Sequence, residues 1–392
     1  MARQNGEGSL RRMNSARAHI LVNAGNDHSI LRFRWSMIEA LRAKGHKVSI
    51  CLWGGDHTAD EACTAADIPV KRLSRSHLGI GAGDALALRS FRRWVAEAGI
   101  DTMLSCNGKA IVLGNLALTG TKRPRSVVLI EGLGEAFGAQ GSPIRQARAK
   151  LGLAGLGVAL MRAQHILVLN AEDEALAKRL APSKKSEVTR LRGIGVDLDR
   201  FAPTPLPPAQ PPLKAIMIAR LVEEKGPRIY AEAGRLLRAK GVPVELHLLG
   251  EFVEGGSGVE RDEVDGWEQE GVLVYHAPRA DVRPLIESAH VLVLPSHYRE
   301  GLPATLMEAA AMGRPVITTD NPGCREALSP GETGLMIPPR DPQALATALQ
   351  EIAANPTRLA PMGTAARCFA EAYFDRKKAD ATFIKALLPN QA

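Results

Sequence analysis

The chain has 392 residues and a net charge of +8, and 45% of its residues are hydrophobic but only 4% aromatic. This length predicts two domains, each with enough apolar residues for a core, and the scarcity of aromatic residues argues against a base-stacking nucleic-acid surface. The five cysteines are scattered, odd in number and form no Cys-x-x-Cys pair, which is typical of a reducing cytoplasm and predicts neither a structural zinc site nor a disulfide framework.

The positive charge is concentrated in the first half of the chain. Residues 1–200 carry 30 Lys or Arg against 18 Asp or Glu, whereas residues 201–392 carry 20 against 24. This asymmetry predicts that the first half faces an anionic membrane leaflet or nucleic acid, although a basic face that only contacts water stays an alternative. No apolar run of 18 residues occurs, so no transmembrane helix is predicted. Residues 1–17 lack the apolar region of a signal peptide, and we expect a flexible tail there.

Residues 18–202 alternate short apolar runs with helical stretches, which predicts a Rossmann-like domain. The predicted strands are 18–25, 47–54, 101–106, 126–131 and 165–170. The loop after the first strand, NAGND, holds one glycine and lacks the Gly-x-Gly-x-x-Gly pattern, so we do not expect NAD to bind. Lys109, after the third strand, is a candidate contact for a phosphate or an acceptor diphosphate.

Two stretches of this half mix apolar and basic residues. Residues 143–163 include Arg145, Arg148, Lys150 and Arg162. They favour either an amphipathic helix at a membrane interface or a core-facing helix with a basic outer face. The same two interpretations apply to residues 88–95.

The two halves are joined by a proline-rich segment. Six prolines lie among residues 203–212, which predicts a stiff, extended linker over 203–213. Just before it, Asp197 and Asp199 have the Asp-x-Asp spacing of some metal-bound nucleotide sites. Because they lie at the domain junction, we assign them a structural role and predict no metal site.

The second half is predicted to be another Rossmann-like domain, over residues 214–370, and one stretch of it organises the site. Val291–Leu294 has the length and composition of a buried strand. A helix is predicted over residues 305–312, with Pro303 near its start and Gly313 at its end. The N-terminus of this helix then opens at the carboxyl end of a strand, where α/β sheets bind anionic ligands.

Glu300 and Glu308 flank that helix start, with seven residues between them. The carboxyl pair of a glycoside hydrolase lies about 5 to 9.5 Å apart. Eight residues of helix cover about 12 Å, so these two carboxylates more plausibly hold different parts of one long ligand. Its phosphates would lie at the helix N-terminus.

This stretch resembles the Glu–seven–Glu signature of the retaining GT-B glycosyltransferases, specifically those of family four. The resemblance extends over most of the second half and more loosely over the first. Its ordered motifs are IARLVEEKGPRIYAEA (218–233), HLLGE (247–251), YHAPRADVRPLIESAHVLVLPS (275–296), REGLPATLMEAAAMGRPVITTDNPGCREAL (299–328) and GETGLMIPPRDPQALATAL (331–349).

The resemblance implies a role for several groups of residues. Arg220 and Lys225 would neutralise the diphosphate that leaves, and Glu300 would orient the donor sugar. Glu308 would hold the ribose. Further donor contacts implied by the motifs are Gly25, Asn26, Gly250, Ala277, Arg279, Gly301, Leu302, Pro303 and Thr305.

The sequence departs from the family pattern after the fourth strand. Many relatives carry a histidine there that touches the donor sugar, whereas this chain has Glu131 and Gly132. A glutamate can accept a hydrogen bond from a sugar hydroxyl or take a proton from the acceptor. Glu131 is therefore a catalytic candidate and, with Gly132, an acceptor-side candidate. The GLGxxF pattern over residues 132–137 resembles a subgroup that elongates lipid-linked bacterial glycans.

We thus expect an α/β protein of the GT-B type, with two Rossmann-like domains facing each other across a cleft. Residues 18–202 would bind the acceptor, and residues 214–370 the nucleotide sugar. Residues 371–392 would form a helix that crosses back to the first domain. The expected activity is transfer of a hexose or N-acetylhexosamine from a UDP-linked sugar to a lipid-linked bacterial glycan precursor, with retention of configuration.

We expect this reaction to need no metal or other cofactor. The protein would be cytoplasmic, either free or bound peripherally at the inner face of the cell membrane, and would bind no nucleic acid. Two alternatives stay open: a nucleotide-sugar epimerase of the same fold, and a non-catalytic basic protein that binds lipid or nucleic acid.

Overall fold

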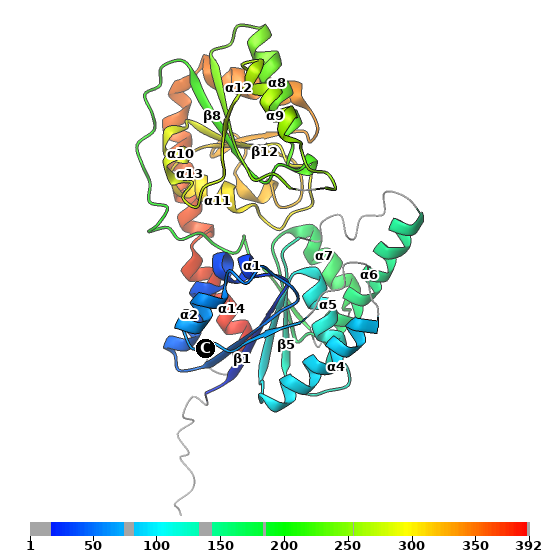
Figure 1. Cartoon of the computed structure of the whole chain (residues 1–392). Coiled ribbons are helices and arrows are strands. Elements are labelled where there is room, and N and C mark those ends of the chain that lie inside the picture. The colour runs from blue at the N-terminus through cyan, green and yellow to red at the C-terminus, as the bar shows by residue number, and fades with distance from the viewer. Residues whose placement is uncertain (1–16, 74–81, 133–142, 183–185, 254, 390–392) are drawn as a thin grey trace, which may run out of the picture. The chain divides into compact units, whose positions relative to one another are not determined.

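The computed structural model describes residues 17–73, 82–132, 143–182, 186–253 and 255–389. Two sheets form its framework, and Figure 1 shows helices on both sides of each sheet. The predicted α/β class with two Rossmann-like domains is confirmed. Most of the expected N-terminal tail (1–16) and the segment 133–137 lie outside the described residues.

The first sheet has seven strands in the order β3-β2-β1-β4-β5-β6-β7. Its strands are β1 His19–Ala24, β2 Lys47–Leu52, β3 Val70–Arg72, β4 Thr102–Cys106, β5 Arg125–Ile130, β6 His165–Val168 and β7 Glu187–Arg190. Its helices are α1 Asp27–Phe33, α2 Trp35–Ala43, α3 Asp60–Ala65, α4 Ala82–Glu97, α5 Gly108–Ala117, α6 Pro143–Arg162 and α7 Ala171–Leu180. β1 pairs in parallel with both β2 and β4, as a Rossmann-like sheet requires.

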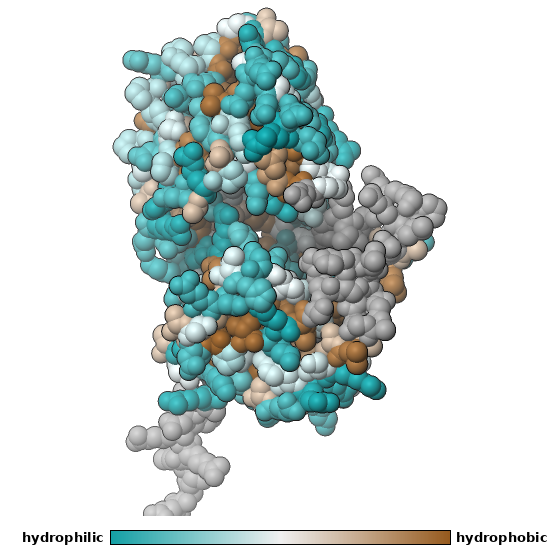
Figure 2. Space-filling view, viewed as in Figure 1, coloured by the Kyte–Doolittle hydropathy of each residue, from teal (hydrophilic) through white to brown (hydrophobic). Residues whose placement is uncertain are grey.

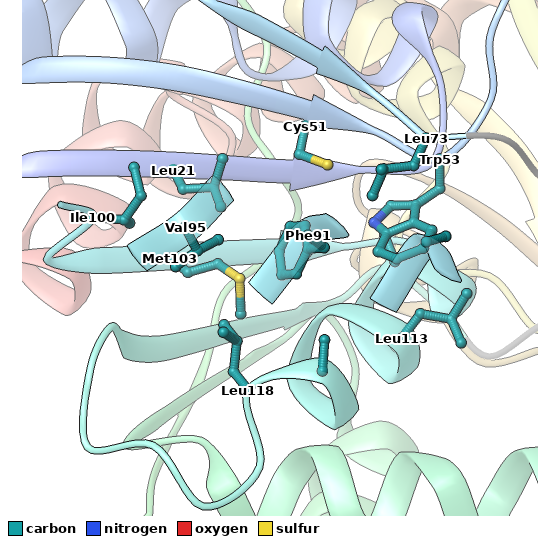
Figure 3. Packing of buried hydrophobic residues seen from close by; sticks show 13 residues of the cluster. Leu21, Cys51, Trp53, Leu73, Phe91, Val95, Ile100, Met103, Leu113 and Leu118 are labelled. Atoms are coloured by element: carbon teal, nitrogen blue, oxygen red, sulfur yellow. The ribbon is translucent and has the colours of Figure 1, made fainter. Parts of the chain in front are cut away.

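Part of the core of this sheet lies under α4 and α5. Figure 3 shows Phe91 and Val95 of α4 pointing toward the strand residues Leu21 and Cys51. Phe91 is fully buried, and its ring centroid lies 5.6 Å from that of Trp53. Aromatic rings bury a large apolar area, and these two rings pack together in the core between the sheet and α4.

The second sheet has six strands in the order β10-β9-β8-β11-β12-β13, and all five neighbouring pairs are parallel. Its strands are β8 Leu213–Ile218, β9 Val244–Leu249, β10 Val274–His276, β11 Val291–Leu294, β12 Val316–Thr319 and β13 Gly334–Ile337. The helices of this half are α8 Pro227–Ala239, α9 Arg261–Gln269, α10 Arg283–Ser288, α11 Ala304–Ala311, α12 Pro342–Ala354, α13 Leu359–Tyr373 and α14 Arg376–Leu387. The short 3₁₀ helices of this half are η2 Glu223–Lys225, η3 Arg325–Ala327 and η4 Pro356–Arg358. α8 packs with α12, and α11 packs with α13.

One fully buried arginine fixes the proline-rich linker to this sheet. The Arg314 guanidinium donates hydrogen bonds of 2.8 Å to the carbonyl oxygens of Thr204 and Pro205 in the linker. It also donates to carbonyl oxygens in or just after α10, those of Ile286, Glu287 and Ala289. A buried charge is stable only with such partners, so Arg314 ties the linker to the end of a helix.

The chain divides into two compact units. The first comprises the described residues up to Val128, Arg162–Gln164 and those from Thr382 onward, and the second comprises the remainder. Within the first unit, Thr102 Oγ1 donates to the carbonyl oxygen of Leu387 at 3.3 Å, so the C-terminal residues pack against β4. Among the described residues, no helix is both long enough and apolar enough to cross a bilayer.

Candidate functional site

The candidate site is built around the segment between β11 and α11. β11 ends at Leu294, and α11 begins at Ala304 with Pro303 in the N-cap position. Proline lacks a side-chain oxygen that would cap the first turn, as serine or aspartate does. The N-terminus of α11 therefore retains the amide donors and the positive dipole end that bind anions.

Glu300 lies in this segment and is held from three directions. Its carboxylate forms an ion pair with the Nζ of Lys225, and both side chains are largely buried. The hydroxyl of Ser296 lies 2.7 Å from the other carboxylate oxygen. The side-chain amide of Asn170 donates to the backbone carbonyl of Glu300 at 2.9 Å. Both the carboxylate and the backbone of Glu300 are thus fixed.

The loop after β8 carries the two predicted cations. Lys225 ends the 3₁₀ helix η2 and its side chain is largely buried, whereas Arg220 lies two residues after β8 and is exposed. Gly226 next to Lys225 has φ +82°, and a Cβ there would lie 2.4 Å from the carbonyl oxygen of Pro295. Only glycine permits this approach, which brings Lys225 to the loop of Glu300.

Glu308, the second glutamate of the signature, lies in α11 and is only 6% exposed. Leu302 and Pro303 are buried, and Thr305 is half-buried. Gly301 is also buried, and a Cβ there would come within 2.6 Å of the Glu131 carbonyl oxygen. The predicted residues 300–308 therefore form one packed unit around the start of α11.

The predicted nucleobase segment follows β10 of the same sheet. Ala277 and Arg279 are exposed, and Gly250 is buried after β9, where its carbonyl accepts from the Tyr275 hydroxyl at 2.9 Å. His276 Nε2 lies 2.8 Å from His247 Nδ1, with the two rings stacked. Burial lowers the pKa of both imidazoles, so they are held in the neutral form.

Glu131 and Gly132 follow β5 and are half-buried. Gly132 has φ +101°, and a Cβ on it would lie 2.5 Å from the Gly301 nitrogen. The backbone after β5 therefore lies directly beside the Glu300 loop. The rest of the GLGxxF pattern, residues 133–137, lies outside the described residues.

The remaining predicted residues belong to the first unit. The Gly25 nitrogen donates to Asn107 Oδ1 at 3.0 Å, and Asn26 caps α1 by accepting from the Ser29 nitrogen at 2.9 Å. Lys109 is half-buried in the first turn of α5. The first strand's loop is thus tied to the loop after β4 through Asn107, which adopts φ +67°.

Sequence reasoning missed three polar residues: Ser296 and Asn170, which contact Glu300, and Asp173, which contacts Asn170. Ser296 lies two residues after β11, Asn170 is the N-cap of α7, and Asp173 lies in the first turn of α7. Asn170 accepts from the Asp173 nitrogen at 2.8 Å and donates to Asp173 Oδ2 at 2.9 Å. The Asn-x-x-Asp spacing before α7 is close to a helix-capping box and could have been recognised. Its contact with Glu300, 130 residues away, has no local signal.

Asp173 is 2% exposed, and this burial raises the pKa of its carboxyl to about 6, although the Asn170 hydrogen bond opposes the shift. Arg299 also favours the charged form, whereas Glu172 and Glu326 disfavour it. A carboxyl with a raised pKa binds more protons in the folded than in the unfolded chain. Its contribution to stability is therefore full below about pH 4 and is lost as the pH rises through about 6.

We expect the Asp173→Asn variant to gain stability relative to the wild type as the pH rises from 4 to 7. Asparagine cannot ionise, so the variant escapes the cost of a buried charge, which amounts to about 3 kcal/mol for a shift of this size. Thermal unfolding at a series of pH values measures the difference. The exposed Asp262→Asn serves as the control. A difference between Asp173→Asn and the wild type that stays constant from pH 4 to 7 would contradict the assignment.

The Asp-x-Asp pair is held by local contacts. Asp197 Oδ1 accepts from the backbone nitrogens of Asp199 and Arg200, both at 3.0 Å, and Asp199 pairs with Lys377 at 2.9 Å. These bonds close a turn and fix it to the start of α14. The described residues contain no group of three or more His, Cys, Asp or Glu placed to hold a metal ion.

Two family models match successive parts of the chain. Residues 31–192 match the glycosyl transferase 4-like domain. Residues 212–355 match the glycosyl transferases group 1, a segment that includes every predicted site residue from Arg220 to Glu308. Together the two matches cover most of the chain.

Two curated proteins illustrate the similarity in sequence. WcaL of Escherichia coli K12, named for a glycosyltransferase role in colanic acid biosynthesis, is 34% identical over 200 residues, 49% of this chain and 48% of WcaL. The chain thus spans about half the length of this relative. The N,N'-diacetylbacillosaminyl-diphospho-undecaprenol alpha-1,3-N-acetylgalactosaminyltransferase of Campylobacter jejuni is 25% identical over 321 residues, 78% of this chain and 82% of that protein.

The fold agrees with a solved structure. HepE of Anabaena, crystallised with UDP, superposes with a TM-score of 0.73 over 94% of this chain and 99% of HepE, at 17% identity. This similarity concerns the fold. The chain belongs to the group 1 glycosyltransferases and has the two Rossmann-like domains of the GT-B fold.

Proposed function

We propose that this protein is a retaining glycosyltransferase that moves a hexose or N-acetylhexosamine from a UDP-linked sugar to a glycan acceptor. The observation that carries the proposal is the Lys225–Glu300 pair next to the N-terminus of α11. A cation, a carboxylate and a set of amide donors are then available at one place. The cation and the amide donors suit the diphosphate of a nucleotide sugar, and the carboxylate suits the hydroxyls of its sugar.

The diphosphate of the donor would be bound by the first turn of α11, Arg220 and Lys225. Negative charge develops on the diphosphate as its bond to the sugar breaks, and fixed cations that meet this charge lower the barrier. Arg220 is exposed and Lys225 half-buried, so Arg220 can reorient toward the ligand while Lys225 is already placed.

The nucleoside would be bound further along the same sheet. Glu308 would accept hydrogen bonds from the ribose hydroxyls, and the segment containing Ala277 and Arg279 would contact the base. The choice of uracil is supported by HepE, whose solved structures contain UDP. Glu300 would then hold hydroxyls of the donor sugar.

Transfer with retention would proceed on one face of the sugar. The acceptor oxygen bonds to the anomeric carbon as the bond from that carbon to the diphosphate breaks, and the acceptor proton passes to the leaving diphosphate. Glu131, beside the Glu300 loop, is the protein group proposed to orient the acceptor or assist this proton transfer. We propose that the reaction needs no metal ion.

The acceptor would be a lipid-linked bacterial glycan precursor. The name of the Campylobacter relative includes a diphospho-undecaprenol acceptor, and the first half of this chain is basic. From residue 136 to residue 171 the sequence contains no acidic residue. Within this stretch, α6 exposes Lys150 together with Leu151, which is 63% exposed, and Met161, which is 58% exposed. Figure 2 shows hydrophobic residues interspersed with hydrophilic ones on the face in view.

We therefore expect the protein to bind vesicles that contain phosphatidylglycerol at low salt and to dissociate from them at 0.5 M NaCl. Each basic residue near an anionic surface contributes about 1 kcal/mol, which salt screens. Vesicle flotation measures the bound fraction. The double variant Lys150→Glu and Leu151→Asp should lose most binding, whereas Val274→Asp, a change at an exposed strand residue, should not. Equal binding of all three proteins would show that α6 does not contact the membrane.

The activity itself is tested with a panel of UDP-, GDP- and ADP-sugars, each with and without lipid-linked glycan acceptors. The proposal predicts rapid UDP release only with a UDP-sugar and an acceptor together, and a product whose anomeric configuration, read by NMR, matches the donor. Loss of transfer in EDTA would contradict metal independence. Conversion of a UDP-sugar without any acceptor would indicate an epimerase. No turnover with any pair, alongside salt-sensitive binding to vesicles or DNA, would indicate a non-catalytic protein.

A further inference from the structure

We propose that the first turn of α7 acts as a positioning element for Glu300, through the side-chain amide of Asn170. This inference rests on the proposed function, because it gives Asn170 a role in transfer. Asn170 touches no substrate in the proposed reaction, so it is a positioning residue and not a catalytic one.

The amide of Asn170 is fully used and therefore fixed. One of its N–H groups donates to Asp173 Oδ2 and the other to the Glu300 carbonyl oxygen, both at 2.9 Å. Its oxygen accepts from the Asp173 nitrogen at 2.8 Å. Asn170 is 1% exposed and Asp173 2% exposed. Rotation of the amide would leave buried donors and acceptors without partners, which costs more than any one of these bonds contributes.

Two further contacts hold the same turn against the same region. Glu172 forms an ion pair with Arg325, which also pairs with Asp320 at 2.8 Å, just after β12. Leu169, which precedes the turn, packs so closely on Gly301 that a Cβ there would lie 2.6 Å from Leu169 Cδ1. The Glu300 loop therefore contacts the residues just before α7 through a hydrogen bond and an apolar contact, and η3 contacts the first turn of α7 through an ion pair.

The consequence concerns where the Glu300 carboxylate lies. Lys225 and Ser296 bind the two carboxylate oxygens of Glu300, whereas Asn170 holds the backbone of the same residue. Without Asn170, the carboxylate can move with its loop while it keeps both side-chain partners. A displacement of about 1 Å at a catalytic group can lower a rate about 100-fold. Donor binding through Lys225 and α11 would be affected far less.

Asn170→Ser separates this role from helix capping. Serine caps a helix about as well as asparagine and can still accept from the Asp173 nitrogen. Its single hydroxyl proton, however, cannot serve both Asp173 and the Glu300 carbonyl. Asp341→Ser is the matched control, because Asp341 caps α12 by the same kind of bond, to the Ala344 nitrogen at 2.8 Å.

For Asn170→Ser we expect kcat to fall about tenfold or more, with the Kd for UDP within twofold of the wild type. The melting temperature should fall by only a few degrees, because one buried acceptor loses its donor while the helix cap is kept. Asp341→Ser should leave kcat unchanged. Wild-type kcat in Asn170→Ser, or an equal loss of kcat and of UDP affinity, would overturn the proposal.

Hydrogen exchange gives a second readout that does not depend on activity. In Asn170→Ser, the amides of residues 299–302 should exchange at least several-fold faster than in the wild type, and those of α12 should not. Unchanged exchange at 299–302 would overturn the positioning role even if kcat fell. A different result is also possible: the wild type transfers no sugar, but exchange in Asn170→Ser is faster than in the wild type. That result would contradict the proposed function and would still support the contact between Asn170 and the Glu300 loop.

Discussion

Glu300→Gln is expected to abolish most transfer while it preserves or strengthens UDP binding. The change removes the negative charge that neutralises Lys225 in the free protein. The diphosphate of UDP then becomes the main partner of this lysine, and a nearby carboxylate no longer repels it. We expect UDP affinity up to about tenfold higher than in the wild type, since charge pairs at partly buried sites contribute about 1 to 2 kcal/mol.

The loss of turnover in this variant has a different cause. Glutamine keeps the shape of Glu300 but is a weaker acceptor for sugar hydroxyls and carries no charge to stabilise a positive sugar in the transition state. We expect kcat to fall about 10²- to 10³-fold, as for the removal of one preorganised charged group elsewhere. Steady-state kinetics and isothermal titration calorimetry separate the two effects.

The free Glu300→Gln protein should also be less stable than the wild type. Lys225 is largely buried, and a buried charge that loses its partner destabilises the fold. UDP should therefore raise the melting temperature of the variant more than that of the wild type. Glu351→Gln, on the exposed side of α12, is the control. Weakened UDP binding together with normal turnover in Glu300→Gln would show that Glu300 contacts the nucleotide and not the sugar.

Lys225→Met and Glu308→Gln are expected to weaken UDP binding through different parts of the nucleotide. A charged hydrogen bond to a phosphate contributes about 1.5 to 3 kcal/mol, so Lys225→Met should weaken UDP about 10- to 100-fold. Lys225→Met should weaken the binding of pyrophosphate by a similar factor. Glu308→Gln should weaken UDP and UMP alike, by about tenfold, and leave pyrophosphate unaffected, because Glu308 is assigned to the ribose.

Calorimetric titration of UDP, UMP and pyrophosphate into each variant measures this pattern. Lys240→Met, an exposed lysine at the end of α8, provides the matched control for the loss of charge. If both variants weakened the binding of pyrophosphate equally, Lys225 and Glu308 would both contact the diphosphate. The proposed assignment of Glu308 to the ribose would then be wrong.

The bounds of strands and helices could be predicted from the sequence where the signals lie within the element itself. The strand Val291–Leu294 occurs as predicted, and the helix predicted over residues 305–312 occurs as Ala304–Ala311, one residue earlier at each end. Capping, glycine and proline act within a few residues, so a sequence displays them directly.

Short edge elements were not predicted. β3 has three residues and β7 has four, and none of their side chains is fully buried. Such segments lack both the apolar run of a central strand and a clear alternation, so their sequence does not distinguish them from loops. They become strands because a neighbouring strand, β2 or β6, offers its free edge.

The sequence alone predicted the fold class, which is confirmed. It also predicted an anion site at the start of α11 from residue type and spacing, and the family resemblance named Glu300, Glu308, Arg220 and Lys225 as candidates. These signals are local to the loops after β8 and β11. The tertiary structure alone decided that Lys225 pairs with Glu300 and that Asn170 holds the backbone of Glu300. These contacts join residues 75 and 130 positions apart. The first contact exists because the neighbouring parallel strands β8 and β11 bring their carboxyl ends to a common edge. The second joins a residue after β6 of the first sheet to a residue after β11 of the second, and no local pattern specifies such a contact.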